Sequence, residues 1–133
     1  MKTHALTPTE AEIDGATNLS AKSFPIDSSW RCPACNRSQR ECVYSGRKGD
    51  WRFQVVMHHD HGGRRFEPVA ICDDCNQVDA RIKNHIRRRS IDLGSKDWSL
   101  TVDEIRMVTK PSPHKEPEID FDSAINIVRQ ALT

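Results

Sequence analysis

Two pairs of cysteines could together form a complete metal site. The pairs are Cys32-Pro-Ala-Cys35 and Cys72-Asp-Asp-Cys75. Four thiolates at this spacing supply a full tetrahedral shell for a structural Zn²⁺ ion, which would join the two segments that carry them. The alternative is a set of unrelated buried or redox-active thiols. We expect Cys42, the fifth cysteine, to be a buried or spare thiol rather than a ligand.

A polar cluster between and beside the cysteine pairs has the side chains of an open metal site. It comprises the run His58-His59-Asp60-His61 and Asn76, which directly follows the second pair. An imidazole, with a reference pKa of about 6.5, can take a proton from water near neutral pH. An imidazole nitrogen and an amide oxygen can also hold a divalent cation and leave positions for water or phosphate oxygens. The alternative is a polar surface cluster or a second structural metal site, and Asn could simply begin a helix at position 76.

A β-hairpin is expected to hold the histidines. Alternating aromatic and β-branched residues predict a strand over residues 51–57, and a shorter strand over 66–71 should return after a Gly62-Gly63 turn. Neighbouring strand residues point to opposite faces. His58 and His59 can therefore face one site only if the strand bends at its end.

The helix after the second strand is the best-defined element of the sequence. Asp73 and Asp74 lie in its first turn and residues 87–89 are arginines at its end, so both ends suit the helix dipole. At about 100° per residue, an apolar side can cover the cysteine site and the hairpin while another stripe faces a ligand. The apolar side consists of Cys75, Val78, Ile82 and Ile86, and the second stripe consists of Asn76, Lys83 and Arg87.

Short extensions flank this central part. Residues 1–29 lack a sustained apolar period and are expected to form a flexible N-terminal arm, either disordered or loosely docked. Residues 30–92 should form the central domain, and residues 93–133 a C-terminal helical extension. The chain is therefore expected to be a small α+β protein with one metal-stapled domain.

Two short helices are expected in the C-terminal extension. A capping box at Thr101 should open a helix that runs to about Val108. A final helix should be capped by Asp122 or Ser123, after an irregular segment that contains three prolines between residues 110 and 117.

The order of these motifs resembles the ββα-metal nucleases, also called HNH or His-Me finger endonucleases. The likeness covers about residues 30–90 and looks most like the zinc-stapled branch typified by phage recombination endonuclease VII. It implies a ββα-metal module stapled by a four-cysteine zinc site, with short C-terminal helices. The family often has Asp where this chain has His58, and some branches carry a second histidine where this chain has Ala80.

The resemblance also implies roles for the polar cluster. His59 would be the general base, and His58 and Asn76 would be ligands of one catalytic Mg²⁺ or Mn²⁺ ion. Apart from the resemblance, the chemistry of the run lets us expect Asp60 to fix an imidazole tautomer, and His61 to orient water or contact phosphate. The implied activity is hydrolysis of DNA phosphodiester bonds by a single-metal, histidine general-base mechanism.

A second class of function remains open beside the endonuclease. It is a non-catalytic zinc-ribbon-like binding module for nucleic acid or a protein partner. A thiol redox function is disfavoured, because metal binding explains both cysteine pairs better.

The charge distribution favours a local contact with nucleic acid. The net charge is +1, but residues 30–98 carry 14 Lys/Arg against 9 Asp/Glu, and each flank is at −2. DNA is the expected partner, through phosphate contacts, with a homodimer or a larger phage or host protein assembly left open. The candidate phosphate contacts are Lys83, Arg87, Arg88, Arg64 and Arg65.

The sequence predicts no contact with a membrane. No stretch approaches the roughly 20 apolar residues that cross a bilayer. A cytoplasmic location is expected, where cysteines stay reduced and C-x-x-C pairs favour metal over disulfides.

Overall fold

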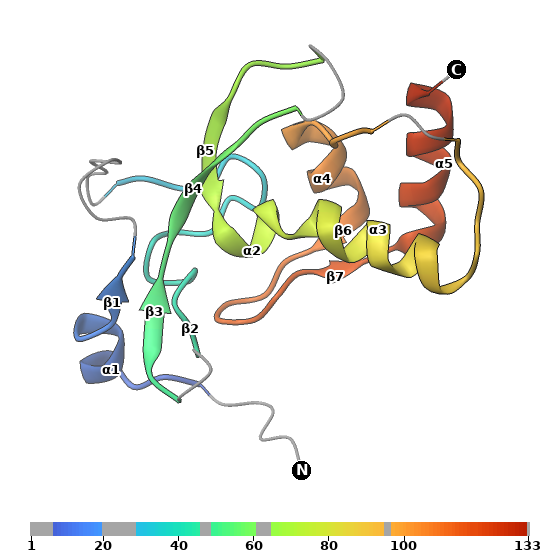
Figure 1. Cartoon of the computed structure of the whole chain (residues 1–133). Helices are drawn as coiled ribbons and strands as arrows, with labels where there is room; N and C mark the ends of the chain where they lie inside the picture. The colour runs from blue at the N-terminus through green and yellow to red at the C-terminus, as the bar shows by residue number, and fades with distance from the viewer. Residues whose placement is uncertain (1–6, 20–28, 46–48, 61–64, 95–96, 133) are drawn as a thin grey trace.

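Two antiparallel strands followed by two consecutive helices form the centre of the structure, a computed structural model (Figure 1). β4 (Val55–His58) pairs with β5 (Val69–Cys72), the first residue of one lying opposite the last residue of the other. α2 (Asp73–Asn76) begins directly after β5, and α3 (Val78–Arg88) follows after a single intervening residue. The structure describes residues 7–19, 29–45, 49–60, 65–94 and 97–132.

The first predicted strand is divided in two. Residues 51–57 were expected to form one strand, but β3 (Trp51–Phe53) and β4 are separated by Gln54. The Gln54 carbonyl accepts a hydrogen bond from the backbone N–H of Asp73 at 3.0 Å, so the start of α2 takes the place of a strand partner there. The second strand is also shorter than predicted, because β5 begins at Val69, immediately after a proline without an N–H to donate.

The N-terminal segment has more regular structure than the sequence predicts. α1 (Glu10–Asp14) has a capping box at Thr9, and β1 (Thr17–Asn18) pairs with β3 in parallel. On its other side, β3 pairs with β2 (Tyr44–Ser45), which gives a small three-stranded sheet. The predicted flexible arm therefore includes a helix and a strand in residues 7–19, and its remaining residues lie outside the described ranges, apart from residue 29.

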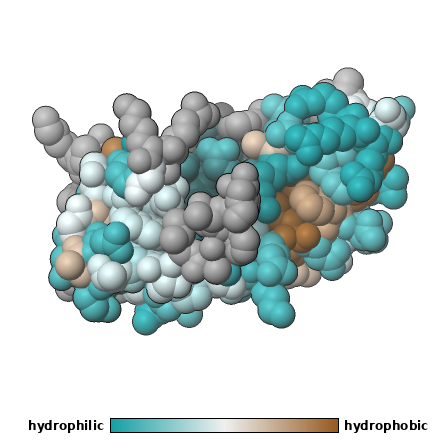
Figure 2. All heavy atoms as spheres, turned by 90° about the horizontal axis from the view of Figure 1, so that it is seen from below, coloured by the Kyte–Doolittle hydropathy of each residue, from teal (hydrophilic) through white to brown (hydrophobic). Residues whose placement is uncertain are grey.

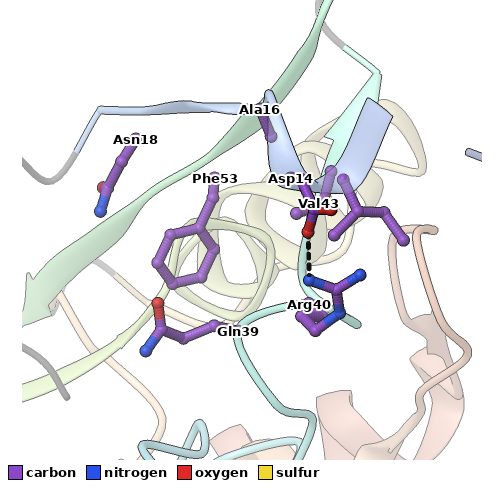
Figure 3. Close-up of a pocket in the computed structure, with 8 residues that line it drawn as sticks. Asp14, Ala16, Asn18, Gln39, Arg40, Val43 and Phe53 are labelled. Atoms are coloured by element: carbon purple, nitrogen blue, oxygen red, sulfur yellow. Dashed lines mark hydrogen bonds and ion pairs between the residues drawn. The ribbon is translucent and has the colours of Figure 1, made fainter. Parts of the chain in front are cut away.

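Exposed ion pairs connect α1 to the cysteine-bearing segment, beside Ile13 and Ala16, which pack against the core. Arg40 reaches Asp14 with a nitrogen–oxygen distance of 2.7 Å (Figure 3). It also pairs with Glu10. A hollow of about 260 Å³ lies beside this contact, with Val43 and Phe53 in its lining. Sequence periodicity could not reveal this docking, since α1 buries none of its residues.

The C-terminal extension packs on the central part through one continuous core. α4 (Val102–Val108) and α5 (Phe121–Ala131) are joined by a hairpin of β6 (Thr109–Lys110) and β7 (Glu118–Ile119), and α5 contacts both α3 and α4. Hydrophilic residues dominate the face seen from below, around a hydrophobic patch (Figure 2). Apart from the cysteines, the core includes Phe53, Val55, Ile71, Val78, Ile82, Trp98, Leu100, Ile105, Val108, Ala124 and Val128.

The two predicted helix starts have different outcomes. The capping box at Thr101 is confirmed: its hydroxyl accepts from the N–H of Glu104, and the Glu104 carboxylate accepts from the N–H of Thr101. The cap of the last helix was placed too late, because the helix begins after Asp120, whose carboxylate accepts from the N–H of Ser123 at 3.1 Å. β7 ends at the preceding residue, so Asp120 is the first position free to cap.

Replacing Thr101 by Ala should lower the free energy of unfolding by about 1 kcal/mol, because the first turn of α4 then loses an acceptor. Thr101→Ser keeps the hydroxyl and serves as the matched control. Urea denaturation followed by circular dichroism measures both variants. Equal stability of the Ala and Ser variants would contradict the capping role.

Candidate metal centres

The four predicted zinc ligands come together in the structure. One sulfur from each of Cys32, Cys35, Cys72 and Cys75 lies within 4.8 Å of the other three, and all four residues are buried. The Cys35 and Cys72 sulfurs are 3.9 Å apart. Tetrahedral zinc–sulfur bonds of about 2.3 Å separate two sulfurs by about 3.8 Å. The buried cluster is therefore compatible with a structural metal such as zinc.

Two different local structures present these thiols. Cys32 and Cys35 sit in a tight turn in which the N–H of Asn36 donates to the carbonyl of Cys32 at 2.7 Å. Asn36 has a φ of 60°, a left-handed conformation that Asn tolerates better than most residues. Cys72 ends β5 and Cys75 lies in α2, so the cluster joins the turn to the junction of hairpin and helix.

The cysteine thiols share their protons unevenly. Hydrogen bonding from the Cys32 thiol lowers the pKa of Cys72 to about 4. Contact with the Cys32 thiol also lowers the pKa of Cys35, whereas neighbouring thiols raise the pKa of Cys75. Thiolate character is thus favoured at part of the cluster, and a cation would favour it at all four positions.

A buried arginine completes the cluster and was not predicted from the sequence. The guanidinium of Arg37 is only 4% exposed and donates to the sulfurs of Cys35 at 3.1 Å and Cys72 at 3.6 Å. It also donates to the carbonyls of Ser112 and Lys115, both at 2.9 Å. A cation beside the sulfurs offsets the negative charge of a metal bound by four thiolates. The available signal was a basic residue two positions after a C-x-x-C pair.

The carboxylate nearest this arginine is a weaker partner than the sulfurs. Asp74 lies 3.6 Å from the Arg37 guanidinium. Burial raises the pKa of Asp74 to about 7, so this carboxyl group is only partly ionised near neutral pH. The charge of Arg37 is therefore balanced mainly by the thiolates.

The fifth cysteine lies beside the cluster but does not belong to it. Cys42 is buried, and its thiol points towards the carbonyl of Arg37 at 3.9 Å. Within the described residues, the cluster has only the four members of the two C-x-x-C pairs. The predicted burial of this thiol is confirmed.

The structure brings His58 and Asn76 together. His58 is the last residue of β4 and Asn76 the last residue of α2, and His58 Nδ1 lies 3.2 Å from Asn76 Oδ1. Two ligands at right angles on an ion, each bonded at about 2.1 Å, lie about 3 Å apart. These two atoms therefore fit adjacent positions on one divalent cation.

His59 borders the same hollow as His58. A hollow of about 190 Å³ is lined by both histidines, by Asn76 and by Lys83. His58 is buried and His59, just beyond the strand end, is exposed. Because β4 ends at His58, the neighbouring residues His58 and His59 can line the same hollow, as expected.

Contacts from distant segments fix the imidazole of His58. Its Nε2 lies 2.6 Å from the carbonyl oxygen of Leu100, and its ring stacks on Phe66 at 5.0 Å between centroids. Asp60, which was expected to fix an imidazole tautomer, accepts from the N–H of Arg65 at 2.6 Å. At His58 Nε2 the contact is made by the Leu100 carbonyl. His61 lies outside the described residues.

The predicted phosphate contacts fall into two groups. Lys83 pairs with Asp97 at 2.9 Å, and Arg65 donates to the Ser99 carbonyl at 2.7 Å as well as pairing with Glu104, so both contact the C-terminal extension. Arg87 and Arg88 are exposed at the end of α3, where phosphate could approach them. Arg64 lies outside the described residues.

No family model matches this chain, and neither does any curated protein or solved structure. In the part of the chain that the structure describes, no helix has both the length and the apolar character needed to span a bilayer. The geometry of the two clusters is therefore the basis for assigning a function.

Substitution of a cysteine in the cluster should have a different effect from substitution of the neighbouring thiol, Cys42. Cys72→Ser is expected to lose bound zinc and to unfold the central part, because a structural zinc contributes on the order of 10 kcal/mol to small domains. Cys42→Ser is the matched control and should retain one zinc per chain. Metal analysis and thermal melts measure both effects. Zinc loss in the Cys42 variant, or full zinc content in the Cys72 variant, would refute the ligand assignment.

Proposed function

We propose that the chain is a metal-dependent endonuclease that hydrolyses DNA phosphodiester bonds with a single divalent ion and a histidine base. The observation that carries the proposal is the 3.2 Å separation of His58 Nδ1 and Asn76 Oδ1 beside a hollow that His59 also lines. A nearby four-cysteine cluster, joined to the same helix, supports the resemblance to zinc-stapled HNH nucleases.

Three residues of the hollow would take part in this reaction. His58 and Asn76 would hold the catalytic Mg²⁺ or Mn²⁺ ion. When bound, the ion neutralises charge on the scissile phosphate and on the departing 3′ oxygen. His59 is exposed at the hollow and would accept the proton of the attacking water.

Basic side chains around the hollow would hold the DNA backbone. Lys83 lies on the wall of the hollow and could exchange its partner Asp97 for a phosphate oxygen. Arg87 and Arg88 extend the basic surface along the end of α3. Such contacts position the strand without reading its sequence.

A binding module without catalysis is the second candidate. Its support is the environment of His58, which is 2% exposed, stacked on Phe66 and bonded to the carbonyl of Leu100, as a structural histidine would be. In this case the four-cysteine cluster would hold a surface for nucleic acid or a protein, and His59 would have no chemical role.

Supercoiled plasmid should be nicked by the protein in the presence of Mg²⁺ or Mn²⁺. His59→Ala should lower the cleavage rate by about 10²- to 10⁴-fold, the usual contribution of a general base. Asn76→Ala should also lower it, through weaker binding of the ion. His114→Ala is the matched control, because this histidine lies in the β6–β7 connection, outside the lining of the hollow, and its imidazole contacts the Val43 carbonyl at 3.0 Å.

Two results would count against the proposal. Metal-independent or undiminished cleavage by His59→Ala would exclude His59 as the base. Binding of DNA by the zinc-loaded protein without cleavage of linear, supercoiled or branched substrates would favour the binding module.

A further inference from the structure

An extended segment of the C-terminal extension lies against the proposed site. We call residues 97–101 the strap. At its start Asp97 pairs with Lys83 of α3, and in its middle the Ser99 carbonyl accepts from Arg65 at 2.7 Å. The strap is thus held on one side by α3 and on the other by the connection between β4 and β5.

Both backbone polar groups of Leu100 are directed at the site. Its N–H donates to Asp79 Oδ1 at 3.1 Å, and its carbonyl lies 2.6 Å from His58 Nε2. Leu100 is 1% exposed and Asp79 7% exposed, so water does not readily replace either contact. A chain of hydrogen bonds therefore runs from a carboxylate of α3, through the strap, to an imidazole of β4.

The contact with Leu100 decides which nitrogen of His58 carries the proton. A carbonyl oxygen accepts hydrogen bonds and cannot donate them, so Nε2 must carry the hydrogen. In the neutral imidazole, Nδ1 is then unprotonated, and it lies 3.2 Å from Asn76 Oδ1. Two acceptor atoms do not bond to each other, but both can bind one cation. The tautomer that Leu100 selects is the one that a metal ligand requires.

The helical segment places Asp79 on the same side as Asn76, where its carboxylate can bind the Leu100 N–H. Asp79 follows Asn76 by three residues, and the intervening Gln77 keeps near-helical angles of φ −77° and ψ −8°. Residues three apart lie on the same side of a helix. One helical turn therefore carries both the amide that faces His58 Nδ1 and the carboxylate that anchors the partner of His58 Nε2.

We propose that Asp79, through the Leu100 backbone, is a positioning residue that holds His58 in the Nε2–H tautomer with Nδ1 towards Asn76. The inference rests on the proposed function for its purpose, since it explains how a buried histidine serves as a metal ligand. It makes the strap a part of the site, although the strap belongs to the C-terminal extension.

The tautomer can be measured without any catalytic metal. Long-range proton–nitrogen NMR spectra of the zinc-loaded protein should show His58 protonated at Nε2 alone. Asp79→Ala should produce a mixture of tautomers and weaken Mn²⁺ binding about 10- to 100-fold, as measured by electron paramagnetic resonance. Its zinc content should stay at one per chain. Asp79→Asn keeps an acceptor oxygen and should retain the wild-type tautomer.

Asp92→Ala is the matched control, because this exposed carboxylate accepts from the N–H of Gly94 beyond α3 and should leave His58 unchanged. A wild-type His58 protonated at Nδ1, or at both nitrogens, would overturn the proposal even if Asp79→Ala failed to fold. The proposal would also be overturned if the Asp79→Ala variant folded and gave unchanged His58 signals. If the wild type nicked DNA in the same study, the endonuclease proposal would still stand. If the tautomer depends on Asp79 but the wild type neither binds Mn²⁺ nor nicks DNA, the positioning role of Asp79 is supported and the proposed endonuclease function is refuted.

Discussion

Four thiolates in a buried space repel one another unless a cation lies between them, and this constraint organises the molecule. The sulfurs of Cys35 and Cys72 are 37 residues apart in the chain but 3.9 Å apart in space. A metal such as zinc at this place would fasten the turn of Cys32 and Cys35 to the point where β5 becomes α2. Asn76 directly follows the last ligand, so its distance from the end of β4 is set by the same cluster. The His58–Asn76 pair depends on this fixed junction.

Local sequence patterns predicted the parts of the fold that are decided locally. The cysteine spacing, the order of hairpin and helix, and the capping box at Thr101 all follow from neighbours within a few residues. The division of the first strand did not, because it depends on the N–H of Asp73 reaching the carbonyl of Gln54. The short strand β1 was missed for a related reason, because its partner β3 lies far along the chain. The helix α1 was missed although its capping box at Thr9 is a local signal, because the segment has no apolar period.

The candidate site was predictable only where side-chain type carries the signal. His58, His59 and Asn76 stand out because imidazoles and an amide follow recognisable motifs, and they do line one hollow. Leu100 is separated from His58 by 42 residues, and its contribution comes from a backbone carbonyl, which every residue possesses. Asp79 resembles any acidic residue in the first turn of a helix until the strap is seen beside it. Interactions made by the main chain leave no trace in composition or spacing.

The buried guanidinium of Arg37 makes the two halves of the chain cooperative. It spans 75 residues of sequence to reach the Ser112 carbonyl while it contacts two sulfurs of the metal cluster. If the cysteines lost their ion and separated, this charge would be stranded away from water, which is costly. Release of the metal should therefore free the loop at Ser112 and Lys115 together with the turn of Cys32 and Cys35. With a metal bound at the cysteines, partially folded states that keep one half intact would be disfavoured, and folding of the two halves would be coupled to metal binding.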